Sequence, residues 1–367
     1  MTGFNPTWFS SPGGTIRDVL GERRWSVSEF AGRMHLGTER AAHIVQGLVP
    51  LDEALAIQLS EVIGGSAEFW RTREQQYLTQ VRLNPDQALD NWLASVPVKE
   101  LIEFGWLPNH SDKREGLLRY FGIVSESDWQ SRYHSFASTH AFRKSSAFST
   151  KEGALAAWLR RGEMLSESYN LRPWDKHQFY DAVLTSKYLT RNKNPEDFVP
   201  KLQEVCASCG VALVIVRAPR GCAVNGAARL IDSERALIQL SFRHLTDDQF
   251  WFTFFHEAAH LILHSTRRLF LDTQQNDEMY HIDQEELEAN AFAAEVVVPR
   301  TAAESLERLR LTPKNIIRFA MDVGVSPGLL VGQLQHSKRI EHSRMNYLKR
   351  RFDWDSLQRI PYPAKYR

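Results

Sequence analysis

The chain is short of cysteine, of net charge and of long apolar runs, and each shortage excludes a class of protein. Its 367 residues include three cysteines, an odd and small number that argues against a disulfide framework. The formal net charge is +1, so no overall field favours nucleic acid or membrane, and any DNA binding must come from a local patch. With 43% hydrophobic and 24% charged residues, the composition is that of a globular chain long enough for two or three domains.

No secretory or membrane-spanning segment stands out. The N-terminus lacks a basic stretch followed by an apolar run, so it does not resemble a secretory signal. The most apolar stretch, Trp251 to Leu263, is interrupted by two histidines and a glutamate and is too short to span a bilayer. Cys206 and Cys209 form a CxxC, but no second pair completes a structural zinc site, so we interpret them as packing residues. These features predict a cytoplasmic protein without a membrane partner.

The first eighty residues predict a run of short helices. Apolar residues recur at three- and four-residue spacings, serine or threonine begins several segments, and glycines follow them. The predicted helices are Thr15–Arg23, Ser26–Met34, Thr38–Gln46, Asp52–Ile63 and Ser66–Leu78. Further amphipathic helices are expected from 86 to about 170, where no chemistry stands out.

The periodicity changes after residue 210. Val211–Val216 and Ala236–Ser241 are apolar runs typical of buried strands, with turn residues between them. Helices are expected at 246–265, 283–297, 302–310, 313–323 and 327–335. Strands that precede a group of helices favour an α+β domain. We therefore predict a multidomain chain with an all-α domain at 1–80, a helical connector at 81–195, an α+β domain at 196–335 and a basic tail at 336–367.

The segment from His256 to His260 reads HEAAH and is an HExxH motif. On a helix, residues four apart share a face, so the two imidazoles can bind one Zn²⁺. Glu257 then stands close to the water that the metal activates, where it can act as general base. The remaining faces of this helix are apolar, which argues against a pair of histidines buried without a function.

A third zinc ligand must come from elsewhere in the chain. The metzincin pattern fails, because no histidine follows His260 at the required spacing. Glu285, Glu286 and Glu288 offer carboxylates about twenty-five residues downstream. A His/His/Glu set would leave the fourth zinc position open, as catalysis requires.

At this point the sequence resembles a known family. HEAAHLILH, followed by EELEANAFAAEVVVP, is similar to the ImmA/IrrE metallo-endopeptidases over about residues 200 to 335. The resemblance implies a zincin-like fold with a small sheet and an HExxH helix, one Zn²⁺, and gluzincin-type endopeptidase activity. It also implies that Glu286, four residues before Asn290, is the third ligand. Helical spacing agrees, because Glu286 and Asn290 share a face on which Asn290 can support the metal.

Three more residues are candidates for roles beside the metal. His264 repeats the four-residue spacing after His260, and we favour a rim or structural role over a fourth ligand. Tyr280 and His281 precede the helix of Glu286, and we consider them as candidates for stabilising a tetrahedral oxyanion.

Residues 26–47 have the spacing of a helix-turn-helix, with Ala31 where the helices cross and Gly37 in the turn. Together with the stretch as far as residue 70, they resemble HigA-type antitoxins of the XRE class. The resemblance implies that 38–46 is the recognition helix and that its DNA-facing residues are Thr38, Glu39, Arg40, His43 and Gln46.

The local charge sets a limit on this interpretation. Residues 1–80 hold seven Arg/Lys against nine Asp/Glu, a net of −2, so the module binds DNA weakly alone, binds as a dimer, or contacts protein instead. The tail from 336 holds nine Lys/Arg against three acidic residues, interleaved with aromatics. That pattern suits nucleic acid or an acidic partner, but we favour a locally docked tail.

Together these features predict a cytoplasmic regulator. Its XRE-like domain binds DNA, and its zinc endopeptidase cleaves a protein substrate, a repressor or an antitoxin-like protein. The alternative is a HigA-like antitoxin or transcription factor that binds DNA and a toxin partner, with a structural or vestigial metal site. Glu257 favours catalysis, because a structural site needs no such carboxylate. The sequence leaves open whether the chain forms a homodimer.

Overall fold

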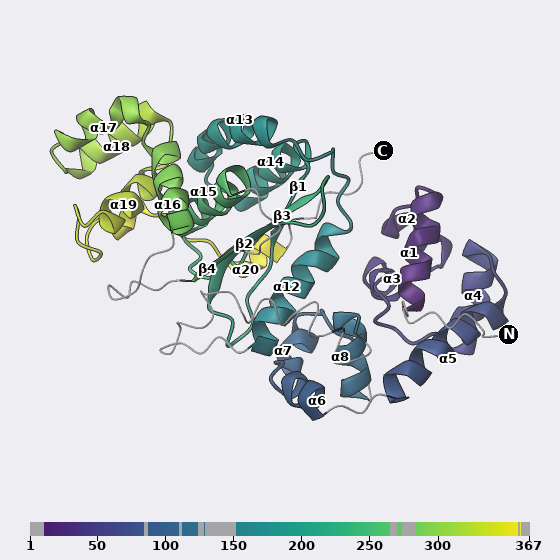
Figure 1. Ribbon diagram of the computed structural model, residues 1–367. Helices are drawn as coiled ribbons and strands as arrows, with labels where there is room; N and C mark the ends of the chain where they lie inside the picture. Colours follow the sequence, from purple (N-terminus) through teal and green to yellow (C-terminus); the bar gives the residue numbers. More distant parts are fainter. Residues whose placement is uncertain are drawn as a thin grey trace. The chain divides into compact units, whose positions relative to one another are not determined.

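The computed structural model describes residues 11–83, 87–109, 112–123, 128, 152–264, 270–273, 284–358 and 360. The chain forms two compact units. The first comprises residues 1–164 with 219–222, and the second comprises 165–218 and 223–367. Figure 1 shows the helices of the first unit and the sheet and helices of the second. The predicted multidomain α+β organisation is confirmed.

The first unit begins with the predicted run of helices, α1 to α5. Their bounds are α1 Pro12–Glu22, α2 Val27–Arg33, α3 Thr38–Val45, α4 Glu53–Ile63 and α5 Ala67–Leu83. Helix α1 begins earlier than predicted because Pro12 suits the first turn of a helix. Ser26 caps α2 in a reciprocal pair, since its hydroxyl accepts from the Glu29 N–H and the Glu29 carboxylate accepts from the Ser26 N–H. Phe30, Leu59 and Trp70 belong to the core that joins these helices.

Further helices follow in the described part of the predicted connector as far as residue 166. They are α6 Gln87–Ala94, α7 Val98–Glu103, α8 Lys113–Phe121 and α12 Glu152–Ser166, whose last two residues belong to the second unit. Arg119 of α8 is buried, and its guanidinium contacts the carboxylates of Glu74 and Glu115. A buried cation needs such partners, so this cluster fixes α8 to α5.

The second unit is built around a four-stranded mixed sheet in the order β1-β3-β2-β4 (Figure 1). Its strands are β1 Val211–Ile215, β2 Val224–Leu230, β3 Ala236–Leu240 and β4 Phe270–Thr273. Strands β1 and β3 are parallel, whereas β2 runs antiparallel to β3 and β4. The sequence predicted β1 and β3 but neither β2 nor β4.

Helices cover this sheet and form the rest of the unit. They are α13 Lys176–Ser186, α14 Pro195–Ala207, α15 Asp247–Leu263, α16 Gln284–Val297, α17 Arg300–Glu307, α18 Pro313–Val323, α19 Pro327–His336 and α20 Trp354–Gln358, with 3-10 turns η2 Lys187–Arg191 and η3 Asn346–Leu348. Cys206 and Cys209 are free, buried and part of the core, as interpreted from the sequence. No helix in the described ranges is both long and apolar enough to cross a bilayer.

Helix α15 is the central element of this unit, and most of its aromatic side chains are fully buried. Trp251, Phe254 and Phe255 are each at most 1% exposed and belong to the core that also includes residues of the sheet. Burying one such aromatic side chain contributes roughly 1.5–3 kcal/mol, so these residues hold the helix firmly in place.

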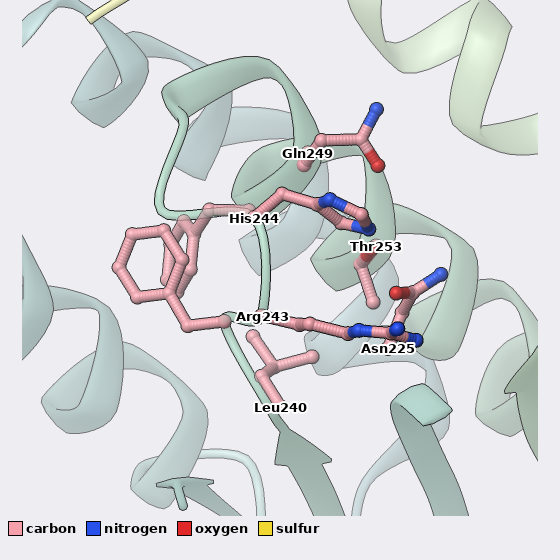
Figure 2. Close-up of a pocket in the computed structure, with 8 residues that line it drawn as sticks. Asn225, Leu240, Arg243, His244, Gln249 and Thr253 are labelled. Atoms are coloured by element: carbon pink, nitrogen blue, oxygen red, sulfur yellow. The ribbon is translucent and has the colours of Figure 1, made fainter. Parts of the chain in front are cut away.

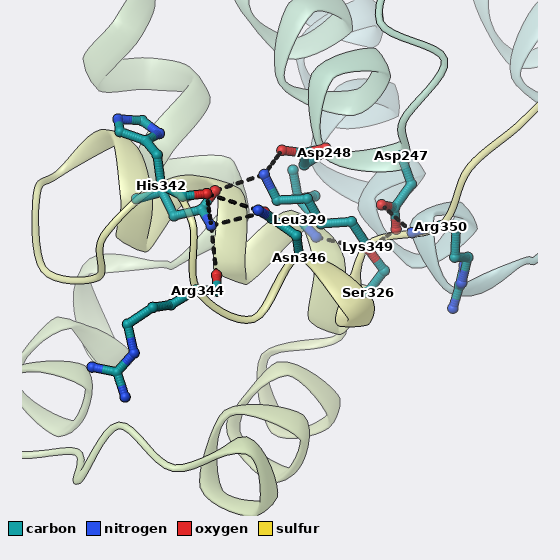
Figure 3. Close-up of polar contacts among 10 residues, drawn as sticks. Asp247, Asp248, Ser326, Leu329, His342, Arg344, Asn346, Lys349 and Arg350 are labelled. Atoms are coloured by element: carbon teal, nitrogen blue, oxygen red, sulfur yellow. Dashed lines mark hydrogen bonds and ion pairs between the residues drawn. The ribbon is translucent and has the colours of Figure 1, made fainter.

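The first turn of α15 is fixed by the C-terminal segment (Figure 3). The Asp247 carboxylate accepts hydrogen bonds from the Ser326 hydroxyl and the Arg350 N–H, both at 2.9 Å, and Asp248 pairs with Lys349 at 2.7 Å. Acidic groups at a helix N-terminus also interact favourably with the helix dipole. The described part of the segment after residue 336 is therefore docked through Lys349 and Arg350, as favoured from the sequence.

Candidate metal centre

Helix α15 places the HExxH motif inside the second unit. His256, Glu257 and His260 are 3%, 0% and 1% exposed. The Nε2 atoms of His256 and His260 lie 3.1 Å apart. The four-residue helical spacing thus brings both imidazoles to one point, as the sequence predicts.

A carboxylate from α16 completes the group. The Glu286 oxygens lie 3.3 Å from His256 Nε2 and 3.4 Å from His260 Nε2. The donor atoms of these three residues are all within 4.8 Å of one another, a set that could hold a metal ion. Of the three carboxylates considered from the sequence, Glu286 reaches the imidazoles, Glu288 contacts His264 instead, and Glu285 is outside the set.

The electrostatics of the centre favour an ionised Glu286 and a neutral His260. Burial acts to raise the pKa of Glu286, but hydrogen bonds and charge from His256 and His260 bring it down to about 2. Burial lowers the pKa of His260, and the Glu286 hydrogen bond opposes this only in part. An ionised carboxylate and neutral imidazoles are the forms that bind Zn²⁺.

The other nitrogen of each imidazole also has a partner. His256 Nδ1 lies 3.1 Å from the Asn290 side-chain oxygen, so Asn290 holds the place expected for a residue that supports the metal shell. His260 Nδ1 lies 3.1 Å from His264 Nδ1, and His264 Nε2 lies 3.2 Å from Glu288. Such contacts fix the orientation and tautomer of metal-binding histidines. His264 therefore supports the group from outside it.

Glu257 lies against a strand that the sequence did not reveal. A Cβ built on Gly226 of β2 would be 2.5 Å from the Glu257 Oε1 and 2.7 Å from the Cγ of the same side chain. Only a residue without a side chain leaves room for the carboxylate here. The available sequence signal was an isolated glycine, which inside a strand often marks a close approach of another group.

Residues 214–334 match the IrrE N-terminal-like domain family, Peptidase M78. The match includes α15, the Glu286 turn of α16 and Gly226, and it confirms the ImmA/IrrE resemblance. We refer to residues 214–334 as the IrrE-like domain.

The chain also resembles a known regulator outside this domain. It is 37% identical over 59 residues to YddM, an uncharacterized HTH-type transcriptional regulator of Escherichia coli K12. The similarity lies in the N-terminal part, covers 16% of this chain, and spans 63% of that regulator, which is less than two thirds of its length. A region similar to a helix-turn-helix regulator thus accompanies the IrrE-like domain, whereas the HigA and XRE assignments stay predictions.

The predicted DNA-facing residues of α3 differ in exposure. Thr38, Glu39 and Arg40 are exposed, whereas His43 and Gln46 are half-buried. His43 Nε2 lies 3.1 Å from the carbonyl oxygen of Gly105 in the first unit. In this conformation His43 and Gln46 are less accessible to a base edge than the sequence led us to expect.

Two residues considered from the sequence fall in a range of the chain that the structure does not describe. Tyr280 and His281, which we considered for oxyanion stabilisation, lie outside the described residues.

Proposed function

We propose that the IrrE-like domain is a zinc-dependent endopeptidase that serves a regulator with a helix-turn-helix region. The observation that carries the proposal is the convergence of two imidazoles and one carboxylate, with a further buried glutamate next to the first histidine. The family match supports a metallopeptidase, and the similarity to a transcriptional regulator supports the link to gene control.

The donor set suits zinc. His256 and His260 would hold the ion through Nε2 and Glu286 through its carboxylate, which leaves a coordination position open. Zn²⁺ bound by such a set supplies a Lewis acid that polarises a carbonyl and lowers the pKa of water toward ~7. Asn290 and His264 would keep the two imidazoles oriented.

The residues of the chain itself would carry the proton. Glu257 accepts a proton at its carboxylate from the water that attacks the peptide carbonyl carbon. It would then return this proton to the amide nitrogen, so that the C–N bond breaks and a carboxylic acid and an amine are released. The packing of Glu257 against Gly226 fixes the carboxylate for both transfers.

The similarity of the N-terminal part to a transcriptional regulator supports a proposal for the substrate and partners. We propose that the exposed start of α3 binds DNA and that the peptidase cleaves a repressor or antitoxin-like protein. The runner-up is a HigA-like antitoxin or regulator that binds DNA and a toxin and whose metal site has no catalytic role. The two proposals differ in whether cleavage occurs, because both allow DNA binding.

The deciding experiment measures metal and cleavage on the same preparation. We expect about one zinc per chain by elemental analysis, and cleavage of the protein encoded by the adjacent gene or of peptides from a proteome digest. His260→Ala should lose both zinc and cleavage. Metal content near zero after mild purification, or unchanged in His260→Ala, would contradict the site. Zinc without cleavage of any substrate would favour the runner-up.

A further inference from the structure

A small pocket with both apolar and polar lining lies beside the candidate catalytic carboxylate (Figure 2), and its apolar lining comes from Leu240, Phe242 and Phe250. Its polar lining comes from three places in the second unit: β2, the loop between β3 and α15, and the first two turns of α15. These residues are Asn225, Arg243, His244, Gln249 and Thr253. The enclosed space of the hollow is about 10 Å³, room for one water-sized group, and the rest is open to solvent, so only the tip of a ligand side chain enters it.

Asn225 enters the pocket because strand β2 is irregular there. The register of β2 against β4 shifts between Val224 and Gly226, so Asn225 is the extra residue of a bulge. Bulges redirect a side chain and are common next to active sites. Asn225 is 7% exposed, and its buried side-chain oxygen has no hydrogen-bond partner within the described part of the chain. A buried amide end in this state points to a missing ligand or water, and a flip of the Asn225 amide would present its NH₂ group to an acceptor there.

Strained backbone flanks two lining residues, Arg243 and His244. Phe242 and Leu245 have φ values of 49° and 52°, and they flank Arg243 and His244. A bulky residue in the left-handed region costs roughly 1–3 kcal/mol, and such strain gathers at functional sites. Figure 2 shows the Arg243 guanidinium and the Asn225 amide on the same side of the pocket, with the His244 ring next to Thr253.

The pocket shares a wall with the catalytic carboxylate. Thr253 lines the pocket and lies one helical turn before Glu257 on α15. A Cβ built on Gly226 would be 2.7 Å from Thr253 Cγ2 and 2.5 Å from Glu257 Oε1, so both side chains contact the same point of β2. A side chain in the pocket therefore belongs to a residue close to the bond that Glu257 serves.

The charge of the lining selects the kind of side chain. The lining contains an arginine, a histidine and two amides but no Asp or Glu. Arg243 is exposed and has no acidic partner among the residues that the structure describes. A guanidinium fork with neighbouring amide donors matches a carboxylate.

We propose that this pocket is a specificity subsite that binds the carboxylate of an Asp or Glu side chain of the substrate. The inference rests on the proposed endopeptidase function. The guanidinium of Arg243 pairs with the substrate carboxylate, and the amides of Asn225 and Gln249 donate to it.

The test compares matched peptides and two charge reversals in the full-length, zinc-loaded protein. Peptides taken from a cleaved sequence carry Glu, Gln or Lys in turn at each position near the cut. We expect kcat/KM for the Glu peptide to exceed that for the Gln peptide by ~10-fold at one position, the scale of one charge-assisted hydrogen bond. Arg243→Glu should abolish this preference and reverse it in favour of Lys, as measured by the ratios of kcat/KM among the three peptides. The matched control is Arg318→Glu, an exposed arginine on α18, which should keep the wild-type preference.

A binding measurement separates this inference from the proposed function. N-acetyl-glutamate amide and N-acetyl-glutamine amide are titrated into the full-length protein, and the side-chain amide NMR signals of Asn225 and Gln249 are followed. Shifts with the glutamate probe that disappear in Arg243→Glu support the subsite even if no peptide is cleaved. Equal responses to both probes, or a Glu preference that Arg243→Glu leaves intact, overturn it.

Discussion

At the scale of single residues, Glu257 and His260 belong to the same motif but differ in what their loss should remove. Glu257→Gln keeps the volume of the side chain but cannot accept a proton. We expect cleavage to fall by ~10²-fold or more, the usual scale of a lost general base, while zinc content and melting temperature stay near wild type. Elemental analysis, thermal melting and peptide cleavage on the same preparations check this.

The control for Glu257→Gln is His260→Ala, which should lose zinc and cleavage together because it removes a ligand. If Glu257→Gln cleaves at the wild-type rate, the assigned mechanism is wrong. If it loses zinc instead, Glu257 supports the metal shell, and the non-catalytic regulator becomes the better proposal.

Gly226 gives a second test at the scale of one atom. In Gly226→Ala the new methyl would meet Glu257 and Thr253 at 2.5–2.7 Å, so Glu257 must move. We expect a stability loss of about 1–3 kcal/mol, typical of overpacking, and a fall in cleavage with zinc retained. Denaturant unfolding and cleavage assays measure the two effects.

A second glycine-to-alanine variant, at a site with free space, shows which effects come from the contact with Glu257 and which from adding a methyl group as such. A Cβ on Gly21 of α1 would have nothing within 4 Å, so Gly21→Ala should change stability by no more than about 1 kcal/mol and leave cleavage unchanged. If Gly226→Ala has wild-type stability and cleavage, the close approach of Gly226 to Glu257 does not affect function.

At the scale of elements, strong periodicity decided what could be predicted. Helices α15 and α16 lie within two residues of their predicted bounds, because each carries a continuous apolar stripe on a long segment. Strand β2 reads VNGAARL, which lacks β-branched alternation and includes a glycine, so it resembled a turn. Its strand conformation is imposed by pairing on both sides, from β3 and β4, which no local pattern records.

The same distinction holds for the candidate site. The HExxH spacing identified His256 and His260, and Glu286 followed from a motif together with helical geometry. Gly226, Asn225 and Arg243 were missed because their roles depend on which strand passes under α15 and on a bulge in that strand. Contacts of that kind are set by tertiary packing and are not visible along the chain.

Helix α3 carries the prediction for DNA. Arg40 is exposed on this helix, so Arg40→Ala should weaken a specific complex with the chain's own promoter by roughly 1–3 kcal/mol, or about 10- to 100-fold, if it contacts a base edge. Gel shifts over a series of salt concentrations measure the loss. The control is Arg71→Ala on α5, where the exposed guanidinium lies 3.6 Å from Glu53. A wild-type chain that binds no DNA even at low salt would make this region a protein-interaction module.

At the scale of the whole molecule, each of the two units contains a hydrophobic core among the described residues. One includes residues between Ile16 and Trp70 in the first unit, and the other includes residues between Phe179 and Leu357 in the second. The two clusters share no residue. Cores that melt separately break two-state behaviour, so calorimetry of the full chain should resolve two transitions.

Zinc removal should move one of these transitions and leave the other in place. The proposed ligands all belong to the second unit, and a ligand that binds the native state alone stabilises it by RT ln(1 + [L]/Kd). At free zinc of about 100 times Kd this is ~2.7 kcal/mol, which for a unit of this size shifts Tm by about 5–10 °C. A chelator should therefore lower one transition by this amount, and readdition of zinc should restore it. In His260→Ala the Tm of the same transition should be low from the outset and unchanged by either chelator or zinc. The Tm of the other transition should match that of the wild type. If chelation moves both transitions together, the units do not unfold independently; if it moves neither, the three residues do not hold a stabilising metal.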